Sequence, residues 1–454
     1  MNKPFKASAK PAKSAPQILD PYLPDSGNTG YEVSHYELDL EYKVASNRLS
    51  GTAVITAVTL AALREFTLDL TDSISVAKVW VNGRHPARFA TSGDKLRIKL
   101  PAVLPADSPL VVTVRYSGSP RPRETLWGDV GFEEISDGVL VSGQPNGAPT
   151  WFPCDDRPCA KASYSIQIST DSAYRAVANG ELTSRRSGSA RTTWTYEQPE
   201  PTPPYLVTLL IGRYETHQLA AAPVRIRATL PARLRDHFDH DFARQTQMMD
   251  LFVTLFGPYP LEAGYTVLVT DDDLEIPLEA QGLSIFGANY CDGTGRSERL
   301  IAHELAHQWF GNSVTVQRWQ DIWLHEGFAC YAEWLWSEHS GGPSADKLAR
   351  RYHRQLAGLA QDLLLADPGP ADMFDDRVYK RGALTLHQLR GRLGDDAFFA
   401  LLRDWTARYR HGNAGSADFS ALAAGYCAEP LDSLWHAWLY SMPLPPLAGP
   451  AATS

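Results

Sequence analysis

Hydrophobic and polar residues alternate with a period of two in the first half of the chain. The clearest alternating runs are residues 36–42, 66–70, 95–100 and 163–168. Turn residues such as Asn82-Gly83 and Asn179-Gly180 separate runs of this kind. Alternation is typical of strands that bury one face. The pattern over residues 31–212 therefore predicts a half-buried antiparallel β domain, shaped as a sandwich or a saddle.

In the second half of the chain the hydrophobic period changes to that of a helix. The predicted helices are residues 234–256, 298–310, 321–338, 345–365, 378–393, 396–409 and 431–440. Strands are expected at residues 224–230, 265–270 and 283–286. A mixed sheet followed by helices predicts a mainly helical α+β domain. The fold class of the whole chain is therefore multidomain α+β.

This pattern divides the chain into four predicted segments. They are a disordered tail (1–20), the β domain (21–218), the mainly helical domain (219–442) and a C-terminal tail (443–454). Residues 1–17 contain no apolar run, so we do not expect a signal peptide. No apolar stretch is long enough to span a membrane. We therefore expect a cytoplasmic protein without a membrane partner.

Charge and cysteine content narrow the function classes. The chain has 454 residues and a formal net charge of −9 at pH 7, which argues against nucleic acid as a partner. Its five cysteines are few and odd in number, so a disulfide framework is not expected. Cys154 and Cys159 lie close enough in sequence to pair or to share a metal. Because no second cysteine pair lies nearby, we expect both to be small core thiols.

The strongest chemical signal is the sequence His-Glu-Leu-Ala-His at residues 303–307. Residues four apart share a helix face, so His303 and His307 can present two imidazoles to one ion. Glu304 lies beside His303, where it can act on a water without binding the metal. Glu326, in the next predicted helix, can supply a third ligand. Three protein ligands leave one tetrahedral position open, which indicates a catalytic zinc rather than a structural one.

The alternative is a chance match on an amphipathic helix. The apolar neighbours of the motif are Leu300, Ile301, Leu305, Trp309 and Phe310. They predict a buried helix, in which unpaired histidine and glutamate side chains are costly. Together with Glu326, this burial favours a single zinc ion as the cofactor.

Residues 303–312 (His-Glu-Leu-Ala-His-Gln-Trp-Phe-Gly-Asn) and 323–329 (Trp-Leu-His-Glu-Gly-Phe-Ala) resemble the aminopeptidase N family of gluzincin metallopeptidases. That family includes the leukotriene epoxide hydrolase. Residues 152–162 are similar to the Phe-Pro-Cys-x-Asp-Glu-Pro segment that ends the family's β domain. Residues 276–280 stand where the family has Gly-x-Met-Glu-Asn, and residues 378–383 resemble the segment with the catalytic tyrosine. The resemblance extends over residues 20–442.

The resemblance implies a thermolysin-like catalytic domain after the β domain, and a zinc-dependent aminopeptidase. It implies that Glu304 is the general base, which takes a proton from the water that the metal activates. Tyr379 is implied to stabilise the oxyanion. Glu279 is implied to bind the free α-ammonium of the substrate, with help from Gln144. The expected partners are peptides with a free N-terminus.

The segment around Glu279 departs from the family pattern. Ile276 replaces the glycine, Leu278 the methionine and Ala280 the asparagine. Pro277 lacks a backbone N–H that an extended substrate would pair with. The carboxylate is kept but the substrate-binding edge is altered, so a gluzincin with endopeptidase or epoxide hydrolase chemistry is an alternative. A non-catalytic peptide-binding relative is a further alternative, against which the complete zinc and tyrosine motifs argue.

Three other polar residues leave alternatives open. His325 replaces the family's usual asparagine beside Glu326, and it either supports the ligands from behind or faces solvent. We do not expect it to be a fourth ligand. Asp321 either orients a zinc histidine or belongs to the acidic residues that favour a helix start. Arg157, where the family prefers glutamate, is expected at an altered surface or in a pair across the domain interface.

Larger members of the family carry a C-terminal helical domain that roofs the active site. This sequence ends with the catalytic domain, so we expect a more open cleft that accepts peptides of varied length. The sequence does not indicate the preferred side chain of the first substrate residue or the oligomeric state.

Overall fold

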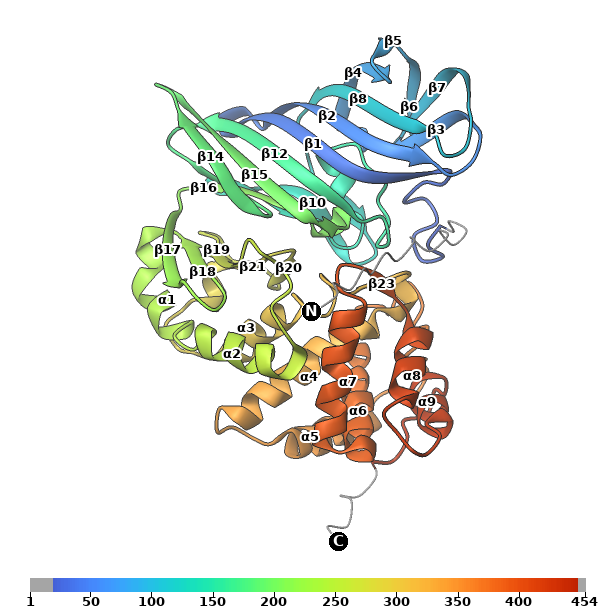
Figure 1. Cartoon of the computed structure of the whole chain (residues 1–454). Coiled ribbons are helices and arrows are strands. Elements are labelled where there is room, and N and C mark those ends of the chain that lie inside the picture. Colours follow the sequence, from blue (N-terminus) through green and yellow to red (C-terminus); the bar gives the residue numbers. More distant parts are fainter. Residues whose placement is uncertain (1–18, 448–454) are drawn as a thin grey trace, which may run out of the picture.

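The computed structural model describes residues 19–447 and consists of a β-rich part followed by a mainly helical part. Figure 1 shows the β-rich part as the upper layer and the helical part below it. The fold class predicted from the hydrophobic pattern is therefore confirmed. The expected disordered tail falls almost wholly on residues 1–18, and much of the expected C-terminal tail on residues 448–454. Both stretches lie outside the described residues.

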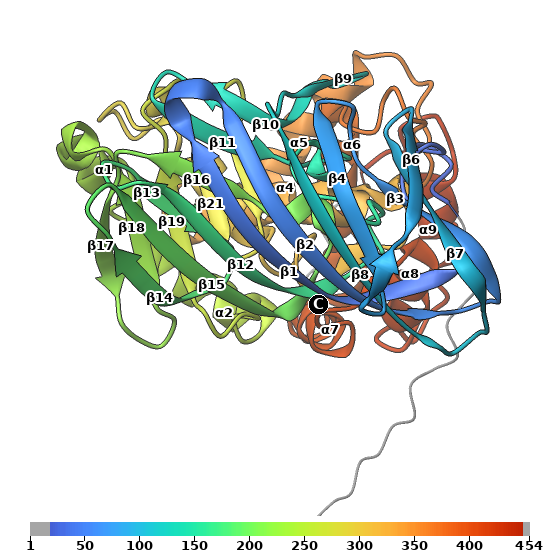
Figure 2. The ribbon, with the colours of Figure 1, turned by 90° about the horizontal axis from the view of Figure 1, so that it is seen from above.

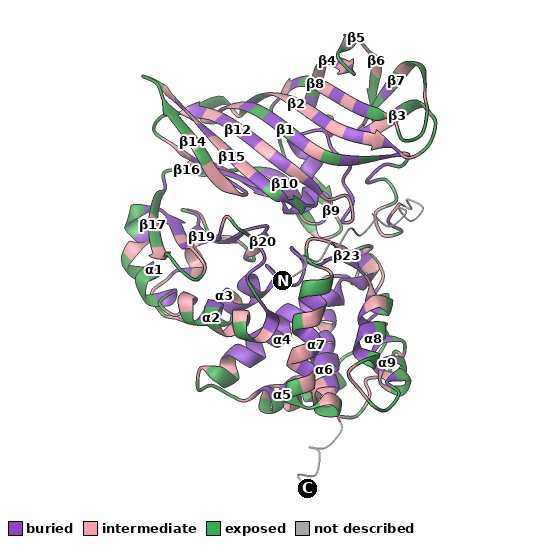
Figure 3. Cartoon of the chain, viewed as in Figure 1, coloured by how far each residue is buried: buried purple, intermediate pink, exposed green. Residues whose placement is uncertain are grey.

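The largest sheet has eight strands. In spatial order they are β14 (Glu181–Ser187), β15 (Arg191–Thr202), β12 (Ala162–Asp171), β1 (Tyr31–Lys43), β2 (Arg48–Thr59), β8 (Pro109–Gly118), β4 (Ile74–Val81) and β5 (Arg84–Pro86). Neighbouring strands are antiparallel except for β1 and β12, which are parallel. Along the described strands buried and exposed residues alternate, as Figure 3 shows for β1 and β2. This alternation confirms the predicted half-buried β domain.

Two smaller sheets complete the β-rich part. One contains β13 (Arg175–Ala178), β16 (Leu209–Gly212), β11 (Gly138–Ser142), β10 (Gly128–Ile135) and β9 (Arg123–Thr125). The other contains β3 (Leu63–Asp69), β7 (Lys95–Leu104) and β6 (Arg88–Ser92). One hydrophobic core joins all three sheets, with Leu38, Ile98 and Val139 as fully buried members. Seen from above, the eight-stranded sheet runs across the front of the molecule, and parts of the helical region are visible around it (Figure 2).

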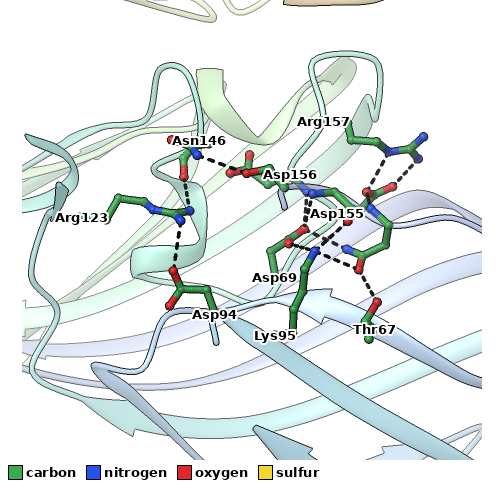
Figure 4. Close-up of polar contacts among 12 residues, drawn as sticks. Thr67, Asp69, Asp94, Lys95, Arg123, Asn146, Asp155, Asp156 and Arg157 are labelled. Carbon is green, nitrogen blue, oxygen red and sulfur yellow. Dashed lines mark hydrogen bonds and ion pairs between the residues drawn. The ribbon is translucent and has the colours of Figure 1, made fainter. Parts of the chain in front are cut away.

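A buried polar cluster fixes the start of the described chain against the β-rich part (Figure 4). Asp69 Oδ2 accepts a hydrogen bond from Gly27 N at 3.0 Å, and Asp155 Oδ1 accepts one from Asn28 N at 2.8 Å. Arg157 donates to both carboxylate oxygens of Asp155, at 3.0 and 2.6 Å. Arg157 is only 5% exposed. The expectation of a surface or domain-interface pair is therefore wrong, since Arg157 pairs with its own segment.

The helical part begins with a five-stranded mixed sheet. Its strands, in spatial order, are β17 (Glu215–Ala220), β18 (Ile226–Leu230), β19 (Tyr265–Val269), β21 (Leu283–Phe286) and β20 (Leu278–Ala280). The helices are α1 (Arg235–Asp241), α2 (Gln245–Phe256), α3 (Glu298–Ala306), α4 (Trp323–His339), α5 (Ala345–Ala357), α6 (Asp376–Leu393), α7 (Asp395–Arg408), α8 (Ser416–Ala424) and α9 (Asp432–Leu439). A short parallel pair, β22 (Thr315–Val316) and β23 (Asn413–Ala414), joins two loops.

Some predicted boundaries differ from those observed. The single helix expected at residues 234–256 is two helices, because the chain turns at residues 242–244 between α1 and α2. The helix expected at residues 345–365 ends at Ala357, where Gly358 is the C-cap. Helix α8 and strands β17 and β20 lie where no element was predicted.

A small apolar cluster joins the two parts of the molecule. The β-rich part contributes Leu140, Val177, Leu210 and Tyr214. The five-stranded sheet of the helical part contributes Leu268, Ala280, Leu283 and Ile285. The cluster therefore holds β20 and β21 against β11 and β16 across the junction.

Within residues 19–447, no helix is both long enough and apolar enough to cross a membrane. All five cysteines are free, and Cys154 is buried while Cys159 is partly exposed. Cys154 is therefore a core thiol as expected, whereas Cys159 lies at the edge of the core.

Candidate active site

Helix α3 places two histidine rings on one face. The helix ends at Ala306, earlier than predicted, but His307 at its C-cap keeps helical angles (φ −56°, ψ −25°). His303 and His307 therefore still project together, with ring centroids 4.8 Å apart. Both side chains are buried.

Helix α4 brings Glu326 to the same point. Glu326 Oε2 lies 3.4 Å from His303 Nε2 and 3.5 Å from His307 Nε2. Ligand atoms bound about 2.1 Å from a tetrahedral ion lie about 3.4 Å from one another. The spacing of Glu326 Oε2 from both ring nitrogens therefore fits one tetrahedral ion, and three such ligands would leave a single position open, as the motif predicts.

The outer nitrogens of the two imidazoles are held by other groups. His303 Nδ1 lies 2.7 Å from Glu333 Oε1, and His307 Nδ1 lies 3.0 Å from the carbonyl oxygen of Phe310. When each Nδ1 carries the proton, each Nε2 is left as the lone-pair atom that faces Glu326. The donor set and its orientation fit zinc.

Glu333 is the residue of the site that the sequence did not reveal. It lies two helical turns after Glu326 on α4 and is 3% exposed. Arg299 donates to both of its carboxylate oxygens, at 3.0 and 2.9 Å. The carboxylate therefore connects a surface arginine to His303. Its burial alone would raise its pKa, but the contact with His303 holds that pKa below the usual value.

Nearby carboxylates change the titration of both histidines. Burial alone would lower the pKa of His303, but hydrogen bonds to Glu326 and Glu333 raise it to about 9. Burial alone would also lower the pKa of His307. The charges of Glu279 and Glu326 raise that pKa to about 10 instead. A divalent cation thus competes with protons for these rings.

Glu304 lies beside the two histidines but is not part of their contact with Glu326. Its side chain is 4% exposed, and its Oε2 has no hydrogen-bond partner among the described residues. Burial raises the pKa of Glu304 to about 7. A buried carboxylate with an unoccupied oxygen can exchange a proton near neutral pH.

Tyr379, near the start of α6, faces the same space. Its ring stacks against the ring of His303, with centroids 6.0 Å apart and planes 17° apart. Burial, reinforced by the charges of Glu326 and Glu279, raises the pKa of Tyr379 well above its usual value. The phenol is therefore protonated and can donate a hydrogen bond.

Glu279 and Gln144 meet across the junction of the two parts. Gln144 follows β11, and its Nε2 donates to Glu279 Oε1 on edge strand β20 at 2.7 Å. Ligand-type atoms of Glu279, Glu304 and His307 all lie within 4.8 Å of one another. The structure therefore brings together all seven predicted site residues: His303, Glu304, His307, Glu326, Tyr379, Glu279 and Gln144.

His325 is a buried neighbour of the site and not a ligand. Its Nε2 accepts a hydrogen bond from Val316 N at 3.0 Å, and the side chain is 1% exposed. Burial lowers its pKa to about 3, so the ring is neutral. Gly311 lies against both His325 and His307, and its φ of +119° favours glycine. The solvent-facing alternative for His325 is wrong.

Asp321 does not contact a zinc histidine. Its carboxylate accepts hydrogen bonds from the backbone N and the Oγ of Ser416, at the start of α8. It therefore serves as an acidic group at a helix start, although the helix is α8 and not α4. The hydrogen bond to a candidate zinc histidine is made by Glu333 and not by Asp321.

Models of two known protein domains match most of the chain. Residues 245–438 match the peptidase family M1 domain, and residues 32–206 match the peptidase M1 N-terminal domain. Leukotriene A-4 hydrolase of Xenopus laevis is 24% identical over 450 residues, which are 92% of this chain and 72% of that protein. Aminopeptidase M1-B of Oryza sativa subsp. japonica is 27% identical over 310 residues, which are 63% of this chain.

The chain spans only 35% of aminopeptidase M1-B and 49% of aminopeptidase M1-D of the same rice. Solved structures match over more of their length. An M1 zinc metallopeptidase from Deinococcus radiodurans has a TM-score of 0.86 and 28% identity, covering 95% of this chain and 99% of that one. A mutant of the Deinococcus radiodurans M1 zinc metallopeptidase, bound to a Tyr-Ser-Ala substrate, has a TM-score of 0.87 and 27% identity, with the same coverage.

Two matching family models, a near-complete structural likeness and a three-ligand site suited to zinc agree with one another. The chain belongs to peptidase family M1 and is a zinc-dependent metallopeptidase.

Proposed function

We propose that this peptidase is an aminopeptidase, which removes single residues from peptides with a free N-terminus. The observation that carries the proposal is the position of Glu279. Its carboxylate lies within 4.8 Å of ligand-type atoms of both Glu304 and His307. A substrate ammonium bound by Glu279 would leave only the first peptide bond close enough to the metal. Gln144 holds the carboxylate in place.

In this mechanism His303, His307 and Glu326 would hold a zinc ion. When bound there, zinc polarises the scissile carbonyl and lowers the pKa of a water. Glu304 Oε2, which has no hydrogen-bond partner in the described structure, would take the proton from the water whose oxygen attacks the carbonyl carbon. Glu304 then passes the proton to the nitrogen of the leaving amine.

Tyr379 stabilises the negative charge that develops on the carbonyl oxygen. Its raised pKa keeps the phenolic proton in place at neutral pH, so Oη donates to the oxyanion. Its stacking on His303 fixes the ring relative to the ligand cluster. The Tyr-Ser-Ala substrate of the similar Deinococcus radiodurans enzyme supports a peptide as the substrate class.

A panel of aminoacyl amides, each free and N-acetylated, tests the proposal with wild type and Glu279→Ala. We expect hydrolysis of the free amines only. Loss of a buried charge partner costs about 2–5 kcal/mol, so we expect the variant to lose at least about 30-fold in kcat/KM, since about 1.4 kcal/mol is a factor of ten. Hydrolysis of acetylated substrates would contradict the proposal and support an endopeptidase instead. The altered residues Ile276 and Pro277 beside Glu279 are the observation that favours this second candidate.

A further inference from the structure

Lys161 reaches from the β-rich part to the turn that follows the zinc helix. The residue directly precedes β12. Its Nζ donates to the carbonyl oxygens of Asn312 and Ser313, at 3.1 and 2.8 Å. The two carbonyls belong to the loop between α3 and β22. Lys161 therefore fixes that loop through two backbone carbonyls.

The same loop holds His307. The backbone N of Asn312 donates to the carbonyl oxygen of His307 at 3.0 Å. The carbonyl oxygen of Phe310 accepts the hydrogen bond from His307 Nδ1 at 3.0 Å. A displacement of the loop would therefore turn the imidazole that binds the metal.

The loop also holds the strand that carries Glu279. Asn312 Nδ2 donates to the carbonyl oxygen of Ala280 at 2.9 Å, and Gln308 Nε2 donates to the same oxygen at 3.1 Å. Ala280 directly follows Glu279 on β20. One loop thus connects a metal ligand to the carboxylate proposed to bind the substrate ammonium.

Lys161 makes no ion pair within residues 19–447. Its hydrogen-bond partners there are the two carbonyl oxygens. Desolvation lowers the pKa of the Lys161 amine well below its usual value. An amine placed among protein atoms without a carboxylate destabilises a fold unless its hydrogen bonds are fixed. The desolvated ammonium of Lys161 therefore adds little to the free energy of folding, and its two hydrogen bonds mainly fix the geometry of the loop.

We propose that Lys161 is a positioning residue for hydrolysis, which sets the position of His307 relative to Glu279 through the loop at residues 310–313. The proposal rests on the proposed aminopeptidase function for its effect on KM. Its effect on metal retention does not depend on that function. Lys161 would act without touching substrate or metal.

The test compares Lys161→Met with wild type. Methionine keeps a long apolar chain and removes the donors. Loss of groups that support metal ligands costs about 10–100-fold in metal affinity or activity. We expect about 10-fold faster zinc loss to a chelator, and a rise of similar size in KM for a free aminoacyl amide. The kcat of the zinc-saturated variant should change less than KM.

Arg225→Met is the matched control. Arg225 also crosses the junction, donating to Glu181 on β14 and to the carbonyl oxygen of Ala263, and among the described residues its side chain makes no hydrogen bond to α3 or β20. We expect this control to lower the melting temperature without changing zinc retention or KM. If Lys161→Met lowers only the melting temperature, as the control does, Lys161 is merely structural and the proposal is overturned.

A second variant covers the case in which Lys161→Met does not fold. Asn312→Ala removes only the side-chain bond to Ala280 and keeps the backbone carbonyl that Lys161 binds. We expect a higher KM with zinc retention near that of wild type. An unchanged KM would overturn the proposal. Cleavage of N-acetylated amides by wild type would instead refute the aminopeptidase function and leave the zinc measurement valid.

Discussion

Gln144 and Glu279 are 135 residues apart in sequence, yet Gln144 Nε2 donates to Glu279 Oε1 at 2.7 Å. The amide comes from the loop after β11 in the β-rich part, and the carboxylate from edge strand β20 in the helical part. Glu279, which is proposed to recognise the substrate terminus, thus belongs to the helical part and is held in place by a residue of the β-rich part.

Gln144→Ala should raise KM more than it lowers kcat. A hydrogen bond to a charged group contributes about 1.5–3 kcal/mol, so we expect a loss of about 10–100-fold in kcat/KM for free aminoacyl amides. Steady-state kinetics with one free amide at saturating zinc measures the effect. An equal fall in kcat at constant KM would place Gln144 in the chemical step instead.

Glu304→Gln should abolish most turnover without removing the metal. Glutamine keeps the size of the side chain but cannot accept the proton, and general base catalysis contributes about 10²–10⁴-fold. Metal analysis should give the same zinc content as wild type, since Glu304 is not one of the three ligands in the proposed site. Substantial residual kcat would mean that another group acts as the base.

Activity should fall on the acid side of neutrality. Burial raises the pKa of Glu304 to about 7, and the positive charge of bound zinc lowers it again. The base works only when it is deprotonated, so kcat/KM should decrease as the pH falls through the pKa of Glu304, which lies below about 7 when zinc is bound. A kcat/KM profile between about pH 4.5 and 8 would test this, and a flat profile would contradict the assignment.

Tyr379→Phe should lower kcat and leave KM nearly unchanged. Phenylalanine can keep the stacking on His303 and loses only the donor. Removal of one oxyanion donor costs about 10²–10³ in kcat. The melting temperature serves as the control, and we expect it to stay close to that of wild type. A changed KM with normal kcat would indicate a role in binding.

Glu333→Gln should weaken zinc binding. Its carboxylate holds His303 Nδ1 at 2.7 Å and is paired with Arg299. Loss of a carboxylate behind a metal-binding histidine costs about 10–100-fold in affinity. Competition with a fluorescent zinc chelator would measure the change. Arg299→Gln is a milder control, because it leaves the contact with His303 intact.

The cluster of candidate metal ligands was predictable because its pattern is local. Residues four apart on one helix must share a face, and α3 and α4 follow each other closely. Glu333 was not predictable in this way, since its contact with His303 depends on how α4 packs against α3. The contact of Asp321 was not predictable for the same reason, because its partner Ser416 lies 95 residues further along the chain.

In the β-rich part, too, contacts between distant segments were not predictable from the sequence. Alternation predicted the buried faces of β1 and β12, which carry Leu38 and Ile166. It did not predict that these strands pair in parallel, because the pairing joins segments more than a hundred residues apart. Burial patterns indicate which face of a strand is covered but not which strand lies beside it.

The apolar cluster at the junction also limits how the chain can be recombined. Leu140 and Leu210 on one side pack with Leu283 and Ile285 on the other. A hybrid that takes its β-rich part from one relative and its catalytic part from another would bring together two surfaces that had not diverged as a pair. Such a hybrid should lose stability unless both faces of this cluster come from the same relative.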